Sequence, residues 1–243
     1  MTGLSARLER IPWRRGLSWP LLLFALFATI GAAMLGMTVG GLVGLHGFGV
    51  LPTGASLPEM LGQSLLAVPC LLGAVAMWPP QGKLAAKLGI RPPGWADAGT
   101  ALLVCVAVLA VGGVLTEGWR ALLDRCGIPY QPEQDLLQAI PDASPAVLIA
   151  LGAVVVVAVP AAEEIFFRRI LFGLLRPLGA WRAVLLTSLI FSLVHFFLLG
   201  VPALFVMGLG FQLAYLLRRN LAAAMLAHGL VNLYALVGTF FEA

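Results

Sequence analysis

The residues best suited to chemistry are two adjacent acids inside an apolar segment. Glu163 and Glu164 follow an uncharged run, residues 146–162, and Arg168 comes shortly after them. Ionisable groups in bilayer-spanning segments are costly, and they usually face a protein or water-filled interior where they serve a function. The acid pair is therefore the first candidate for a functional site.

The spacing around the acid pair assigns the two carboxylates different roles. Glu164 and Arg168 are four residues apart with the acid first, which is the favourable order for an ion pair on a helix. Glu163 lies about 100° away around the same helix. We therefore predict a structural pair between Glu164 and Arg168, which leaves Glu163 free to meet other groups.

Two of the three histidines lie in later apolar runs, each with a partner four residues away. Phe191 precedes His195, and His228 precedes Asn232, so each pair shares one helix face. A carboxylate helped by an imidazole can take a proton from water. The oxyanion that follows needs donors, which an imidazole N–H and an asparagine amide can supply. This set favours peptide hydrolysis without a covalent intermediate, since the sequence contains neither a GxSxG nor an HExxH motif.

The composition places these residues in a membrane. The chain has 243 residues, of which 60% are hydrophobic and 11% charged, and its mean hydropathy is +0.99. Soluble domains carry about 25% charged residues. We predict an all-α fold, a polytopic helix bundle in the lipid bilayer, with residues 1–243 forming a single integral membrane domain. The basic residues fall in short loops, which argues against a nucleic acid partner.

Seven apolar runs approach or exceed the roughly 20 residues that cross a bilayer as a helix. The site is predicted to be buried between the fourth, fifth and seventh spans. Two short neighbours, the fifth and sixth, could instead form a re-entrant pair. The seven predicted spans are 18–46, 57–79, 96–122, 146–175, 181–199, 201–217 and 221–240.

Charge asymmetry predicts the orientation. Four groups of basic residues, which hold 13 of the 15 lysines and arginines, fall on one side of this layout: the N-terminus, 83–91, 168–182 and 218–219. The positive-inside rule then places the N-terminus in the cytoplasm and the C-terminus outside. The run from Leu17 to about Val50 is too long for the apolar part of a signal peptide, so we expect a retained first span. The expected location is the cell inner (plasma) membrane.

The remaining polar features predict structure rather than chemistry. Cys70, Cys105 and Cys126 are odd in number and lack metal-ligand spacing, so no disulfide framework and no cysteine zinc knuckle are expected. The 118–145 segment contains four prolines, which disfavour a long helix. It could be a lid or a substrate-guiding loop, but it is interpreted as a solvated connector.

Three motifs in order resemble a known family. EEIFFR (163–168), FSLVH (191–195) and HGLVN (228–232) resemble the EExxxR, FxxxH and HxxxN motifs of the CPBP family. These CAAX-protease and bacteriocin-processing membrane proteins, also called the ABI family, include the type II CAAX prenyl endopeptidases. The resemblance covers a catalytic core at about 145–240, and residues 1–144 carry no such motif.

The resemblance implies a glutamate-dependent intramembrane endopeptidase without metal or other cofactor. By analogy, Glu163 and His195 activate the water, and His228 and Asn232 line the oxyanion site. The supporting residues are then Glu164, Arg168 and Phe191. The implied substrate is a membrane-tethered protein or peptide, cut near its C-terminus or in its tethered segment. The chain departs from the family at Arg169, where many relatives carry glycine.

Three other functions remain open. A non-catalytic membrane protein, acting in immunity or as a scaffold, would be favoured by the loss of a motif acid or histidine, and none of these residues is lost. A transporter with a buried ionisable cluster would show discontinuous helices in repeated halves, which the sequence does not display. A zinc protease would use two histidines and a glutamate as ligands.

Overall fold

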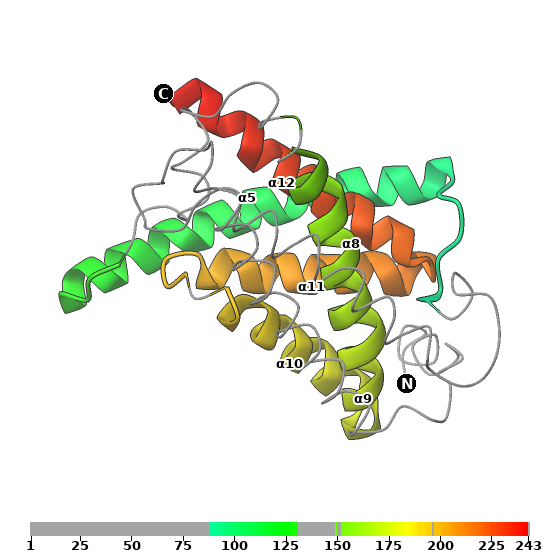
Figure 1. Ribbon diagram of the computed structural model, residues 1–243. Helices are drawn as coiled ribbons and strands as arrows, with labels where there is room; N and C mark the ends of the chain where they lie inside the picture. The colour runs from blue at the N-terminus through cyan, green and yellow to red at the C-terminus, as the bar shows by residue number, and fades with distance from the viewer. Residues whose placement is uncertain (1–87, 131–148, 150–151, 196, 243) are drawn as a thin grey trace, which may run out of the picture.

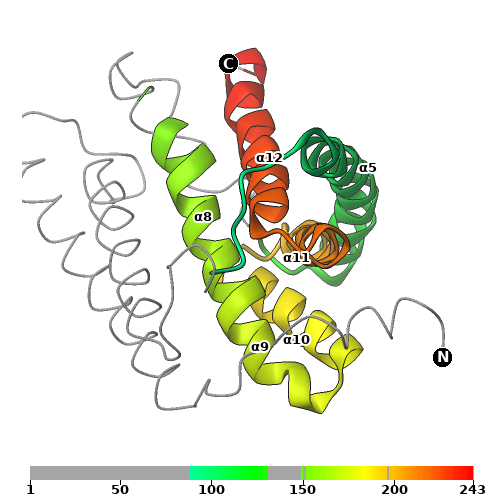
Figure 2. The ribbon, with the colours of Figure 1, turned by 90° about the vertical axis from the view of Figure 1, so that its right-hand side faces the viewer.

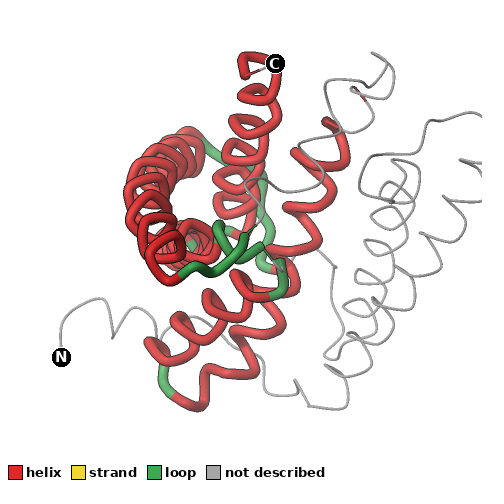
Figure 3. Tube along the Cα trace, turned by 90° about the vertical axis from the view of Figure 1, so that its left-hand side faces the viewer, coloured by secondary structure: helices red, strands yellow, loops and turns green. Residues whose placement is uncertain are grey.

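The computed structural model describes residues 88–130, 149, 152–195 and 197–242, and of 239–242 only the backbone. Helices and the turns that connect them make up this part of the chain, which contains no strand (Figure 3). The all-helical prediction is therefore confirmed for these residues. The first two predicted spans, 18–46 and 57–79, lie outside them.

The first long helix of this region is α5, Trp95–Cys126. Asp97 accepts a hydrogen bond from the Gly94 N–H at 2.9 Å, which satisfies one donor at the helix start. Gly127 ends the helix in the left-handed region, with φ 63°. The predicted span 96–122 is correct at its start but ends too early. The helix continues into the predicted 118–145 connector because its first proline is Pro129; residues 131–148 lie outside the described part.

The segment that carries the acid pair is a helical rod with changing pitch. It contains η1 (Val154–Ala158), α8 (Val159–Glu164), η2 (Ile165–Leu171), α9 (Phe172–Leu175) and η3 (Arg176–Leu178). Both η1 and η2 are π-helical, and η3 is a 3₁₀ turn. The sequence predicted one span over 146–175 and did not predict the two π segments that flank the acids. Such π turns leave some backbone groups without their usual partners and often occur at functional sites.

Three helices follow the rod: α10 (Ala180–Leu193), α11 (Val201–Arg218) and α12 (Leu221–Glu242). The last two agree with the predicted spans 201–217 and 221–240. The predicted span 181–199 is wrong at its end. The chain has to reverse between Leu193 and Val201 to begin α11, so α10 stops six residues short of that predicted end and His195 lies in a turn.

Three of these helices are long and apolar enough to cross a membrane, by length and composition: Trp95–Cys126, Val201–Arg218 and Leu221–Gly238. Helix α10 is shorter, about 21 Å at the usual helical rise. The outer face of α5 exposes large apolar side chains, including Leu103 and Val114 at 74% each. A water-soluble surface rarely presents so continuous an apolar face. These helices indicate a multi-pass membrane protein.

Helix α12 packs between α5 and the rod, while α11 lies beside α5 and contacts α10 (Figures 1 and 2). The main core lies where α5, η2, α10, α11 and α12 converge, and includes Phe167, Phe191, Phe211 and Val231. At one end of the bundle, the Trp119 indole donates to the Leu198 carbonyl at 3.0 Å. This bond joins α5 to the turn that carries His195.

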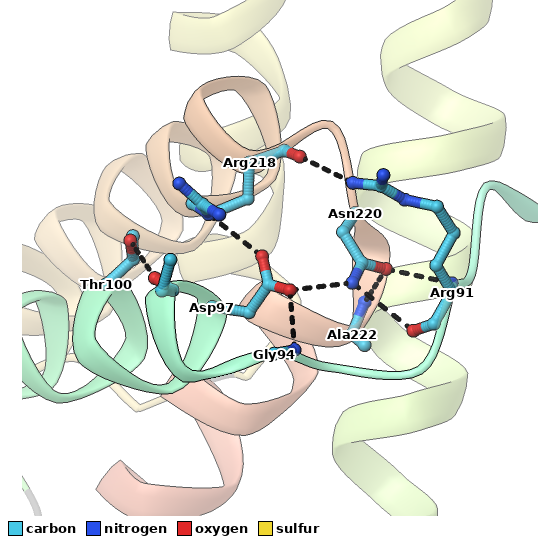
Figure 4. A network of polar contacts seen from close by, with 8 residues as sticks. Arg91, Gly94, Asp97, Thr100, Arg218, Asn220 and Ala222 are labelled. Atoms are coloured by element: carbon cyan, nitrogen blue, oxygen red, sulfur yellow. Dashed lines mark hydrogen bonds and ion pairs between the residues drawn. The ribbon is translucent and has the colours of Figure 1, made fainter.

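The opposite end of the bundle is joined by a polar network (Figure 4). We call Arg91, Asp97, Arg218 and Asn220 the end network. Arg218 Nε pairs with Asp97 Oδ1 at 2.8 Å. Asn220 accepts from the Arg91 N–H at 3.0 Å and donates to the Arg91 carbonyl at 3.2 Å. The network joins the starts of α5 and α12 to the end of α11, and thus brings two of the predicted basic groups to the same end.

Candidate active site

The acid pair of the site lies at the end of α8, directly before η2. Glu164 is the last residue of α8, and its Oε2 lies 3.0 Å from Arg168 Nε. Both side chains are almost completely buried, with exposed fractions of 0% and 1%. The ion pair predicted from the four-residue spacing is therefore present. Arg168 also donates to the Gly208 carbonyl of α11 at 3.4 Å.

His228 of α12 lies between the two acids. Its Nδ1 is 3.0 Å from Glu164 Oε1, and its Nε2 is 3.9 Å from Glu163 Oε2. The spacing argument expected Glu163 to meet the histidines, but His228 contacts Glu164 more closely. This is possible because a carboxylate has two oxygens, so Glu164 binds Arg168 through one and His228 through the other.

The two acids differ in exposure. The Glu163 side chain is 28% exposed, whereas that of Glu164 is fully buried. Oε2 of Glu163 has no hydrogen-bond partner within the described part of the chain. Glu163 is thus the more exposed of the two acids, although its Oε2 is itself buried, and Glu164 is the acid that contacts both Arg168 and His228.

Aromatic rings surround the Arg168 guanidinium. Its central carbon lies 4.7 Å from the ring centroid of Phe191, 5.6 Å from that of Phe211 and 5.7 Å from that of Phe167. A cation over an aromatic face is attracted to the ring quadrupole, most strongly where water is excluded. The Phe211 ring also stacks on His228, with centroids 4.6 Å apart and planes 16° apart. The rings thereby fix the positions of both Arg168 and His228.

His195 meets the site through Phe191. Its Nδ1 lies 2.6 Å from the Phe191 carbonyl, and the two rings are 4.7 Å apart. Because a carbonyl only accepts, Nδ1 is assigned the proton, which leaves Nε2 as the nitrogen that can react. The Phe191 ring also contacts His228, at 5.9 Å between centroids. The three sequence motifs therefore meet around Phe191.

The Asn232 side chain is hydrogen-bonded to the backbone of η1. Its Nδ2 donates to the Val155 carbonyl at 2.9 Å. In η1 the Val159 N–H bonds to the Val154 carbonyl, five residues back. The next donor in that register would be residue 160, which is a proline without an N–H. Asn232 thus supplies the donor that Pro160 lacks.

Two buried residues of α11 were not predicted. Phe211 belongs to none of the three motifs. Its contacts with His228 and Arg168 are to other helices, so no spacing in the sequence indicates them. Gln212 is also fully buried in α11, and neither of its side-chain amide atoms has a hydrogen-bond partner among the described residues. An amide embedded in an apolar helix was the only signal available for it.

Metal ligands are not grouped in the part of the chain that the structure describes. There, no three side chains of His, Cys, Asp or Glu lie close enough together to hold an ion. The two described cysteines are free; Cys105 is buried and Cys126 is exposed. Cys70 lies outside the described residues.

The helices and the site define a class: a helical membrane protein in which Glu164, Arg168 and His228 are buried and the partly exposed Glu163 and His195 lie around them. Residues 145–234 match the family model described as "Rce1-like: Type II CAAX prenyl endopeptidase Rce1-like". Over this segment, the match agrees with the resemblance to the CAAX-protease family that the three motifs indicated, and proteins of that description are peptide hydrolases. No curated protein and no solved structure matches the chain in these comparisons.

Proposed function

We propose that this protein is a metal-independent intramembrane endopeptidase of the glutamic type. The observation that carries the proposal is the position of His228 between a fully buried acid, Glu164, and a partly exposed one, Glu163. Glu164, neutralised by Arg168, accepts from His228 Nδ1–H, which directs Nε2 toward Glu163. This arrangement provides a base and an acid–base nitrogen next to each other in an apolar interior.

In the proposed reaction, Glu163 takes one proton from a water molecule whose oxygen attacks the peptide carbonyl carbon. The carbonyl becomes a tetrahedral oxyanion, and the C–N bond then breaks as a proton passes to the leaving nitrogen. His228 Nε2 is placed to relay that proton, since its Nδ1 is held by Glu164. Stabilising the oxyanion by preorganised donors is usually a large part of such catalysis.

His195 is the second imidazole of the proposal. The family resemblance pairs it with Glu163 in water activation. Its Nδ1 bond to the Phe191 carbonyl leaves Nε2 for the reacting peptide, as at His228. The shared contact with the Phe191 ring is consistent with both imidazoles acting on one substrate.

The proposed substrate is a membrane-tethered protein or peptide, cut near its C-terminus or within the tethered segment. The family model that matches residues 145–234, that of a CAAX prenyl endopeptidase, supports a substrate of this kind. We further propose the orientation that the basic loops predict, with the N-terminus in the cytoplasm and the C-terminus outside the inner (plasma) membrane.

The test is a cleavage assay in liposomes on a library of tethered C-terminal peptides, with and without a chelator. The variants are Glu163→Gln, His228→Gln and His195→Gln. Glu117→Gln is the matched control, because Glu117 is an exposed acid that pairs only with Arg120 among the interactions described. General acid–base groups contribute about 10²–10⁴-fold, so we expect losses of that size in the three site variants and none in the control.

Each outcome bears on a different part of the proposal. Cleavage that survives Glu163→Gln in a folded protein would exclude Glu163 as the base. Cleavage abolished by the chelator would favour a zinc protease. A folded wild-type protein that cleaves no library member and no native substrate would favour a membrane scaffold or immunity protein.

A further inference from the structure

Asn232 and Pro160 are linked by the backbone of η1. Pro160 has no N–H, so it cannot donate to the Val155 carbonyl in the π register or to the Val156 carbonyl in the α register. An unpaired backbone carbonyl in a membrane interior costs free energy comparable to a lost hydrogen bond. The sequence therefore leaves the Val155 and Val156 carbonyls, eight and seven residues before Glu163, without the hydrogen bond that residue 160 would otherwise donate.

Helix α12 faces both of these carbonyls. Asn232 Nδ2 donates to the Val155 carbonyl at 2.9 Å. One turn earlier, a Cβ added to Gly229 would lie 2.6 Å from the Val156 carbonyl oxygen. Glycine at this position therefore lets the two helices approach closely enough for Asn232 to reach η1.

The same face of α12 also contacts the acid pair of α8. His228 precedes Gly229 and contacts both Glu164 and Glu163. Since His228 and Asn232 are four residues apart, they lie on one side of α12, and that side contacts the rod at two levels: at the acids and at η1. The bond to Val155 thus fixes how the rod is rotated and shifted against α12, and with it the direction of Glu163.

We propose that Asn232 is a positioning residue, whose amide replaces the backbone donor absent at Pro160 and so holds the π segment that aims Glu163 at His228. This role acts through the helix rather than on the oxyanion, and it deepens the proposed function, on which its catalytic consequence rests. Its structural consequence, the dependence of Asn232 on Pro160, does not require any activity.

The test is a double-mutant cycle of Asn232→Ala and Pro160→Ala, read by thermal unfolding in detergent. Alanine at 160 restores an N–H and is well tolerated in helices. We expect Asn232→Ala to lower the Tm clearly in the native background and only slightly in the Pro160→Ala background. Equal shifts in the two backgrounds would mean that the residues are not coupled, and would overturn the proposal.

Cleavage kinetics distinguish a positioning role of Asn232 from a role in stability alone, which would leave kcat per folded molecule unchanged. If Asn232 acts only through η1, Asn232→Ala lowers kcat at least tenfold in the native background. In the Pro160→Ala background, the same change lowers kcat less than threefold, measured against the Pro160→Ala single variant. If Asn232 binds the oxyanion, the fold-loss in kcat is the same in both backgrounds even where stability is restored, and the positioning role is excluded. Asn232→Leu, which keeps a similar size but has no donor for the Val155 carbonyl, should behave like Asn232→Ala.

Discussion

Two carboxylate–arginine pairs in this molecule have nearly the same length and very different surroundings. In the end network, Asp97 and Arg218 pair at 2.8 Å, and the arginine is 34% exposed. In the site, Glu164 and Arg168 pair at 3.0 Å with almost no exposure. Backbone groups and Asn220 surround the first pair, whereas aromatic rings and an imidazole surround the second.

The two pairs also differ in how completely the polar atoms around them are hydrogen-bonded. The end network satisfies its polar atoms with local partners and joins three chain segments (Figure 4). The site instead leaves several buried polar atoms without a hydrogen-bond partner in the described structure, among them Glu163 Oε2 and Arg168 Nη1. Such groups are costly in an apolar interior. The predictions below test this contrast, from the largest expected effect to the smallest.

Arg168→Met should destabilise the protein most. Removing one partner of a buried ion pair leaves the other charge uncompensated and costs about 3–5 kcal/mol. The matching change at the end network, Arg218→Met, should cost about 1 kcal/mol or less because that pair is partly solvated. Chemical unfolding of both variants in detergent measures the two losses. Similar losses at both positions would break the comparison.

Gly229→Ala should have the next largest effect. The added Cβ would lie 2.6 Å from the Val156 carbonyl oxygen, so α12 and η1 must separate. Overpacking of this kind costs about 1–3 kcal/mol, and cleavage should fall with it because His228 moves away from the acids. Gly113→Ala in α5 is the control, since a Cβ there meets nothing within 4 Å. A Gly229→Ala variant that cleaves normally would show that this close approach is unnecessary.

Gln212→Leu should stabilise the protein. Replacing a buried amide that lacks partners with an apolar side chain of similar size removes a desolvation cost of about 1–3 kcal/mol. Thr187→Val in α10 is the control, because the Thr187 hydroxyl already donates to the Ala183 carbonyl at 2.7 Å. Thermal unfolding decides the sign. A lower Tm for Gln212→Leu would mean that the amide has a polar partner beyond the described residues.

Asn220→Ala should destabilise the protein modestly and leave catalysis intact. Asn220 accepts from the Ala222 N–H at 3.3 Å at the start of α12, and losing such a cap costs about 1 kcal/mol. The expected kcat per folded molecule is unchanged, because the end network lies away from the acids. A large fall in kcat with normal stability would show that the network also directs His228.

The sequence predicted the features that depend on local spacing. The ion pair of Glu164 and Arg168 follows from four-residue spacing on a helix, and the structure contains it. The long apolar runs at 201–217 and 221–240 predicted α11 and α12 nearly to the residue. The three motifs also indicated the family whose model matches residues 145–234.

Features that depend on contact between distant segments were not predicted. The end of α10 is set by the reversal before α11, which hydropathy does not register. The π form of η1 depends on a partner 77 residues away, Asn232, as well as on Pro160. Phe211 contacts Arg168 and His228 only because three helices converge. The catalytic assignments themselves, and the seven-span layout, stay predictions.

The hydrogen bond from Trp119 to the Leu198 carbonyl makes the turn after α10 visible to spectroscopy. The indole lies at the far end of α5, and its partner is three residues beyond His195. Indole emission responds to hydrogen bonding and to the polarity around the ring. The difference in fluorescence between the native protein and Trp119→Phe should therefore report, in real time, whether this turn shifts when a peptide enters the bundle.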